Sequence, residues 1–169
     1  RGIIELLGGN ISVQSKLNVG TEFTFTIPFK GVKPKKEKKI KRKLPSNSLS
    51  NKNILIAEDG SSARLYFKVA LKDTHAKILF ANNGKMAVDL FQDHPEIDLV
   101  LMDIGMPIMD GFEAAKRILK MNPKAKIIAQ SAYVMADEKE RCHKIGFKDY
   151  LTKPIQKDNL IDTIAKWTE

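Results

Sequence analysis

Short apolar runs alternate with amphipathic stretches along the C-terminal two thirds of the chain. The apolar runs are 54–57, 78–80, 99–102, 127–129 and 150–151, and the amphipathic stretches are 61–71, 86–91, 112–119, 137–145 and 160–167. Brief continuous apolar runs are typical of strands buried on both faces, and the longer stretches carry apolar residues at helical spacing. The pattern predicts five βα units, hence an α/β fold in which a five-stranded parallel sheet has helices on both faces.

Residues that start or stop helices support these boundaries. Asp110 and the pair Ser61-Ser62 can cap helix starts, and Gly146 can end a helix. Pro107 and Pro154 lie just past predicted strands, where no ladder donor is needed.

A different pattern occupies the N-terminal part of the chain. Residues 3–7 read as an apolar helix end stopped by Gly8-Gly9, and Phe23, Phe25 and Ile27 alternate with threonines in the stretch 11–27. The pattern predicts a helix end followed by a β-hairpin that turns at 18–20. An isolated hairpin hides little apolar surface, so self-association through this face is an expected property.

The net charge of +9 is concentrated in the N-terminal third. Residues 1–50 hold 11 Lys/Arg and 3 Asp/Glu (+8), whereas residues 51–169 hold 18 and 17 (+1). Most of the excess lies in the lysine-rich run 33–43, which has almost nothing apolar to bury and is followed by turn formers, and this composition is typical of a solvated linker. We therefore expect three parts, 1–31, 32–51 and 52–169.

Composition argues against a membrane-spanning or secreted segment and against a disulfide or zinc site. No apolar stretch approaches the ~18 residues of a membrane-spanning helix, and the N-terminus has no signal-peptide pattern, so a soluble segment is expected. The single cysteine, Cys142, has no partner for a disulfide or a zinc site and is interpreted as a packing residue.

Polar residues fall at the ends of four of the five predicted strands. Glu58 and Asp59 follow the first strand, Asp103 ends the third, Ser131 ends the fourth and Lys153 follows the fifth. In such sheets, ligands bind at the carboxyl ends of the strands. Three carboxylates crowded there need protonation, a cationic partner or a metal, and an all-oxygen set suits Mg²⁺ (or Mn²⁺). The arrangement suits phosphoryl transfer, with Asp103 as the nucleophile.

The segment 53–167 resembles the receiver domain of two-component response regulators. The resemblance is carried by Ile54-Leu55-Ile56-Ala57-Glu58-Asp59, Asp103-Ile104-Gly105-Met106-Pro107-Ile108-Met109-Asp110-Gly111, Gln130-Ser131-Ala132 and Tyr150-Leu151-Thr152-Lys153-Pro154. It implies a flavodoxin-like sheet with strand order 2-1-3-4-5. It also implies that Asp103 is the phosphoacceptor, that Asp59 and Asp103 bind Mg²⁺ directly, that Glu58 binds it through water and that Gly105 contributes its backbone carbonyl.

The same resemblance implies a switch. Lys153 is expected to pair with the phosphoryl oxygens, the Ser131 hydroxyl to turn toward the new phosphoryl group, and Tyr150 to turn inward behind it. Two positions depart from the family pattern, because Gly105 and the bulky Tyr133 stand where polar side chains are common. Neither can readily hold a hydrolytic water, so we expect a long-lived aspartyl phosphate.

The N-terminal strings resemble the last helix and hairpin of the ATP-binding domain of sensor histidine kinases. They are Ile4-Glu5-Leu6-Leu7-Gly8-Gly9-Asn10-Ile11 and Gly20-Thr21-Glu22-Phe23-Thr24-Phe25-Thr26-Ile27-Pro28. The order of parts is similar to the C-terminal end of a hybrid sensor histidine kinase. The nucleotide-binding boxes are absent from this segment, so any enzymatic activity of its own is expected to be limited to phosphoryl transfer onto itself.

The resemblance also implies partners and a location. His75, His94 and His143 lie in no phosphodonor motif. The expected donor is therefore a phosphohistidine on a kinase dimerisation domain or a histidine phosphotransfer protein. We expect a cytoplasmic location, compatible with a membrane-anchored parent.

Three other functions fit the sequence less well. A haloacid-dehalogenase-like phosphatase would want a second acid where Gly105 stands. A non-phosphorylated docking module would be expected to lack Asp103, Asp59 or Lys153, and all three are present. The lysine-rich run could bind nucleic acid, but no aromatic or recognition-helix pattern accompanies it, so no specific nucleic-acid partner is expected.

Overall fold

The computed structural model describes residues 2–28, 49–132 and 136–169. These residues belong to two compact units, a small N-terminal one and a larger C-terminal one, each of which is described by itself. Most of the expected linker 32–51 lies outside the described residues, and so does Tyr133.

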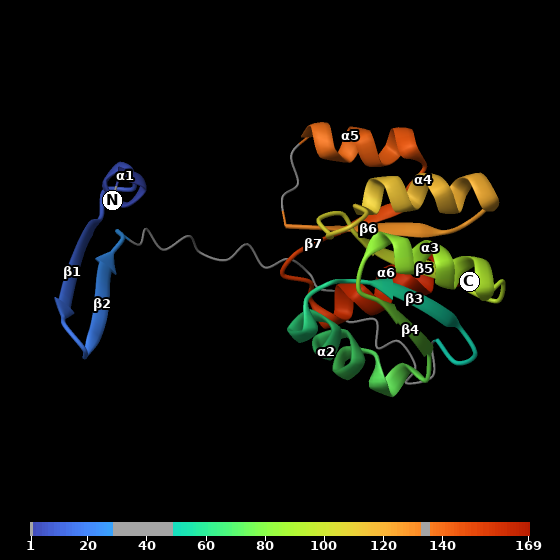
Figure 1. The fold of residues 1–169 in the computed structure, drawn as a ribbon, viewed down its shortest axis with the longest axis horizontal. Helices are drawn as coiled ribbons and strands as arrows, with labels where there is room; N and C mark the ends of the chain where they lie inside the picture. The colour runs from blue at the N-terminus through green and yellow to red at the C-terminus, as the bar shows by residue number, and fades with distance from the viewer. Residues whose placement is uncertain (1, 29–48, 133–135) are drawn as a thin grey trace, which may run out of the picture. The chain divides into compact units, whose positions relative to one another are not determined.

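The N-terminal unit is a helix end followed by a β-hairpin, as the sequence predicts (Figure 1). It consists of α1 (Gly2–Leu6), β1 (Asn10–Lys16) and β2 (Gly20–Thr26), and the two strands pair antiparallel. Val13 pairs with Phe23, and their side chains are 57% and 67% exposed. The apolar face of this hairpin is therefore open within its own unit.

The C-terminal unit alternates strands and helices. Its elements are β3 (Asn53–Ala57), α2 (Ser61–Ala70), the 3₁₀ turn η1 (Lys72–Thr74), β4 (Lys77–Ala81), α3 (Gly84–Asp93), β5 (Leu99–Asp103), α4 (Gly111–Met121), β6 (Ile127–Ser131), α5 (Ala136–Ile145), β7 (Asp149–Thr152) and α6 (Lys157–Thr168). All neighbouring strand pairs are parallel, in the order β4-β3-β5-β6-β7. This is the expected order 2-1-3-4-5, counted along the unit, so the predicted fold is confirmed.

Helices cover both faces of this sheet (Figure 1). Side chains alternate along each strand, so Ile54 and Ile56 pack with α2 and α6, whereas Leu55 and Ala57 pack with α3, α4 and α5. The central strands β3 and β5 are buried along almost their whole length, and most of their side chains are apolar. A sheet covered in this way leaves the carboxyl ends of its strands as the place where polar groups can gather.

The helix boundaries test the predicted caps. The Asp110 side chain accepts a hydrogen bond from the backbone N–H of Glu113 at 2.8 Å, which confirms this cap. Gly146 follows α5 with a φ of +110°, a conformation that suits glycine, and confirms the predicted helix end. The prediction for Ser61-Ser62 is wrong, because the cap position of α2 is Gly60, which makes no side-chain cap.

Candidate functional site

The carboxyl ends of β3 and β5 bring the predicted carboxylates together. Ala57 pairs with Met102, so Glu58 and Asp103 occupy neighbouring positions just beyond that pair. Carboxylate oxygens of Glu58, Asp59 and Asp103 all lie within 4.8 Å of one another. Glu58 and Asp103 are only 3% and 7% exposed, whereas Asp59 is exposed to solvent. Two of the three carboxylates are therefore buried, and the third faces the solvent side of the cluster.

Lys153 bridges the two buried carboxylates. Its Nζ donates to Glu58 Oε2 at 2.7 Å and to Asp103 Oδ2 at 2.6 Å. Partial burial by itself lowers the pKa of this ammonium group, but the hydrogen bonds and negative charges of Asp103 and Glu58 outweigh that effect and raise the pKa above its ordinary value. The side chain therefore carries its positive charge between two acids at neutral pH.

The remaining oxygens of the buried carboxylates are held by backbone groups. Glu58 Oε1 accepts from the N–H of Gly60, and Asp103 Oδ1 accepts from the N–H of Gly105, each at 3.1 Å. Each carboxylate thus uses one oxygen on the lysine and one on its own following loop. This arrangement fixes their orientation before any ligand arrives.

Two glycines near Asp103 have opposite environments. A Cβ on Gly111, at the start of α4, would lie 2.1 Å from the carbonyl oxygen of Asp103, so only glycine fits there. A Cβ on Gly105 would meet no atom within 4 Å. The backbone behind Asp103 is therefore tightly packed, while the position two residues after it is open.

Arg64 supports the loop between β3 and α2, a role that the sequence did not predict. Its Nη1 donates to the carbonyl oxygens of Glu58 and Asp59, at 2.8 and 2.7 Å. The contact fixes the backbone that carries both acids. An arginine in the first turn of an amphipathic helix gives no sequence signal for this role, because such positions usually face solvent.

The two predicted switch residues contact helix α5 rather than the carboxylates. Ser131 ends β6, and its hydroxyl donates to Glu138 Oε2 at 2.8 Å. The Tyr150 side chain is 38% exposed, and Lys139 Nζ lies 4.5 Å from the centroid of its ring. Among the described residues, then, the structure brings Glu58, Asp59, Asp103 and Lys153 together. Ser131 and Tyr150, in β6 and β7, instead contact side chains of α5.

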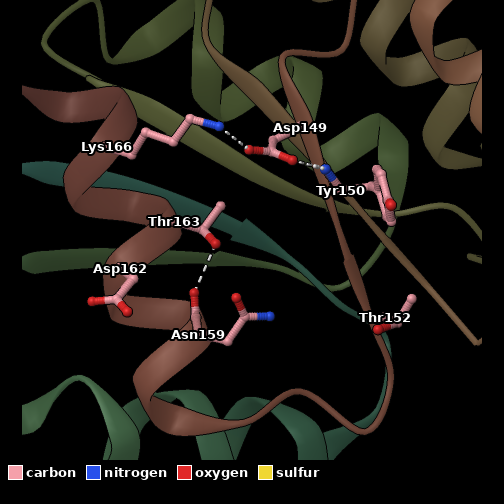
Figure 2. Close-up of a pocket in the computed structure, with 7 residues that line it drawn as sticks. All are labelled: Asp149, Tyr150, Thr152, Asn159, Asp162, Thr163 and Lys166. Carbon is pink, nitrogen blue, oxygen red and sulfur yellow. Dashed lines mark hydrogen bonds and ion pairs between the residues drawn. The ribbon is translucent and has the colours of Figure 1, made fainter. Parts of the chain in front are cut away.

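A shallow pocket between β7 and α6 is separate from the carboxylates and contains none of the predicted metal ligands (Figure 2). Asp149 Oδ2 accepts from Lys166 Nζ at 2.8 Å and from Trp167 Nε1 at 2.9 Å, which ties the edge strand to the last helix. Burial alone would raise the Asp149 pKa, but the hydrogen bonds from Lys166 and Trp167 lower it overall. The polar groups here join two elements of the fold.

Comparison with known proteins identifies the family. Residues 54–165 match the model of the response regulator receiver domain. The chain belongs to this family. This confirms the resemblance found in the sequence, and the receiver is a phosphorelay signalling module.

Two sensor kinases and one solved complex are similar to this receiver. The sensor histidine kinase GacS of Pseudomonas protegens is 35% identical over 75% of this chain and 14% of its own length. The autoinducer 1 sensor kinase/phosphatase LuxN of Vibrio campbellii is 29% identical over 98% of this chain and 21% of its own length. The Saccharomyces cerevisiae complex of the histidine phosphotransfer protein Ypd1 and the Ssk1 receiver domain matches 71% of this chain and 90% of the matched chain, at 27% identity and a TM-score of 0.66.

The chain therefore spans about a seventh to a fifth of the length of these kinases. Within residues 2–28, 49–132 and 136–169, no helix combines the length and apolar character that crossing a membrane requires.

Proposed function

We propose that this receiver takes a phosphoryl group from a phosphohistidine onto Asp103. The observation that carries the proposal is the buried Asp103 carboxylate, held between Lys153 and its own loop at the carboxyl edge of the sheet. A carboxylate oxygen of Asp103 attacks the phosphorus and forms the O–P bond. The P–N bond breaks, its electron pair stays on the imidazole nitrogen, and that nitrogen takes up a proton.

The acidic cluster fits a divalent cation. Asp59 and Asp103 would bind it directly, the carbonyl of Gly105 would complete the protein ligands and Glu58 would act through water. The three carboxylates offer oxygens that lie within 4.8 Å of one another, and such all-oxygen donors suit Mg²⁺ or Mn²⁺. Such an ion supplies positive charge that balances the phosphoryl oxygens during transfer.

Lys153 has a second role in this proposal. Its ammonium group neutralises Glu58 and Asp103 in the resting state. Once Asp103 carries a phosphoryl group, the same ammonium can pair with a phosphoryl oxygen, while Ser131 donates to another and Tyr150 turns inward. The added negative charge thus selects between two hydrogen-bonded arrangements.

A donor domain can dock beside this edge. Leu65 and Val69, one turn apart on α2, are each 62% exposed, and Ile108, in the loop after Asp103, is 82% exposed. Exposed apolar side chains near a reaction site are typical of a protein interface. They support docking of a kinase dimerisation domain or a histidine phosphotransfer protein.

We propose that the receiver belongs to a cytoplasmic hybrid sensor kinase, with 1–31 as the end of an ATP-binding domain, 32–51 as a linker and 52–169 as the receiver. The LuxN alignment, which extends over nearly the whole chain, supports this context. Self-association through the hairpin, the absence of a specific nucleic-acid partner and a long-lived aspartyl phosphate stay predictions.

Intact mass after incubation with acetyl phosphate tests the proposal. We expect the wild type to gain one phosphoryl group in the presence of Mg²⁺ and none when the cation is chelated. Asp103→Asn should abolish the gain. Asp89→Asn is a matched control, because Asp89 lies exposed on α3, where it pairs with Lys85. A wild type that stays unmodified, and that does not bind the phosphoryl analogue beryllofluoride, would favour the static docking module instead.

A further inference from the structure

The Ser131 hydroxyl is committed to an acceptor on helix α5. It donates to Glu138 Oε2 at 2.8 Å, and Glu138 lies half-buried near the start of that helix. A hydroxyl has one proton to donate, and an ionised carboxylate can only accept. While this bond persists, Ser131 cannot donate its proton to a phosphoryl oxygen on Asp103.

The same helix contacts the second switch residue and covers a small apolar cavity. Lys139 lies over the Tyr150 ring, and Cys142, one turn beyond Glu138, is 5% exposed. Glu138 and Cys142 line the cavity together with Ile104 and Ala129. Burial raises the pKa of the Cys142 thiol, and the charge of Glu138 adds to this effect, so the carboxylate acts on the cavity electrostatically as well as by contact.

We propose that Glu138 is a positioning residue that holds the Ser131 hydroxyl on α5 in the resting receiver, so that phosphorylation must break this bond and loosen the start of α5. The inference rests on the proposed function, because it concerns the hydroxyl that would bind the phosphoryl group. Two physical effects act in the same direction. Ser131 can serve only one of two acceptors, and a phosphoryl dianion near Ser131 repels the Glu138 carboxylate.

The size of the effect follows from the hydrogen bond. A bond to a charged group contributes more than a neutral one, and part of that contribution is lost to solvent at a half-buried site. Removing it should raise the affinity for beryllofluoride, a phosphoryl analogue, by about 3- to 10-fold in Glu138→Ala. Glu138→Gln keeps a neutral acceptor and should fall between the wild type and Glu138→Ala.

Two readouts separate positioning from a general structural role. The first is beryllofluoride affinity at fixed Mg²⁺, measured with Ser131→Ala in a double-mutant cycle. If Glu138 acts through Ser131, Glu138→Ala should raise the affinity of the Ser131→Ala variant clearly less than that of the wild type, because only the charge repulsion is left to remove. The second is the labelling rate of Cys142 by a thiol reagent, which is unambiguous because the chain has a single cysteine.

We expect Glu138→Ala without beryllofluoride to be labelled several-fold faster than the wild type, and the wild type to be labelled faster once beryllofluoride and Mg²⁺ are added. Glu140→Ala is the matched control, since Glu140 lies exposed on the same helix and pairs with Lys144. Wild-type affinity and labelling in Glu138→Ala would overturn the inference. So would an affinity gain that persists undiminished in the Ser131→Ala background. No beryllofluoride response in the wild type would overturn the proposed function, and this inference with it.

Discussion

The two halves of the site are held in different ways. In the carboxylate half, Glu58 and Asp103 are buried, and each is bound both by Lys153 and by a backbone N–H. In the switch half, Ser131 and Tyr150 are held by half-buried or exposed side chains of one helix. Buried, charge-assisted contacts are costly to rearrange, whereas partly exposed ones exchange readily. The residues proposed to carry the chemistry are therefore pre-organised, and the proposed conformational response would lie in the part of the site that is easier to move.

The largest loss of stability is expected from removing the Lys153 ammonium group, which lies between the two buried carboxylates. Lys153→Met keeps an unbranched side chain but leaves two buried carboxylates without a counter-charge, so we expect a loss of about 3 kcal/mol in unfolding free energy at pH 7. Phosphorylation by acetyl phosphate should fall at least tenfold. Urea unfolding measures the first quantity and intact mass the second.

The pH dependence of this variant provides its control. The Lys153 pKa is raised in the folded state, so its contribution is fully present below the unfolded value of about 10.4 and is lost as pH rises through the folded pKa. The wild type should therefore keep this contribution throughout the neutral range. The deficit of Lys153→Met should therefore shrink only as the pH rises through the folded pKa of Lys153, and Mg²⁺ should stabilise the variant more than the wild type. A deficit that is independent of both pH and Mg²⁺ would contradict the electrostatic account.

A smaller loss of stability is expected from adding a side chain next to the backbone of Asp103. Gly111→Ala places a Cβ 2.1 Å from the Asp103 carbonyl oxygen, so β5 or α4 must shift, at a cost of about 2 kcal/mol. Gly105→Ala enters open space and should change the unfolding free energy by less than about 0.5 kcal/mol. Equal melting temperatures for the two variants would show that the loop adapts and that the carboxylate half is less rigid than its contacts suggest.

The sequence predicted the carboxylate half better than the switch half, for a physical reason. The strand ends follow from local patterns, and the strand order, which the resemblance to receiver domains implied, brings Glu58, Asp103 and Lys153 together once the sheet forms. The contacts of Arg64 and Glu138 depend on how each helix is rotated and placed, and both are ordinary residue types for a partly exposed helical position.

Packing partners near the ends of elements were also hidden from the sequence. Leu49 is fully buried in the core between the sheet and helices α2 and α6, although its neighbours are serines and asparagines that are typical of a loop. Gly60 occupies the cap position of α2, and Ser61 and Ser62 are already inside the helix, so neither hydroxyl stands at the cap. Such details are decided by tertiary contacts, which residue type and spacing do not specify.

The smallest effect is expected at Gln130, which lies in β6 between the two halves. It pairs with Asp103 in the sheet and precedes Ser131, and strand alternation places it on the same face as Ile128, among apolar side chains. It is fully buried, and neither polar atom of its side chain has a hydrogen-bond partner among the described protein atoms. A buried amide without a partner is destabilising, whereas an apolar residue of similar size is not.

We therefore expect Gln130→Leu to raise the unfolding free energy by about 1 kcal/mol, measured by urea unfolding. Gln130→Glu is the opposing variant, because it places a further acid in the same buried position and should destabilise the fold at neutral pH more than in acid. A loss of stability in Gln130→Leu would show that the amide is hydrogen-bonded in solution, for example to a buried water. A hydrogen-bonded Gln130 would then form a polar link in β6 between Asp103 and Ser131. The two halves of the site would be connected through it rather than only adjacent.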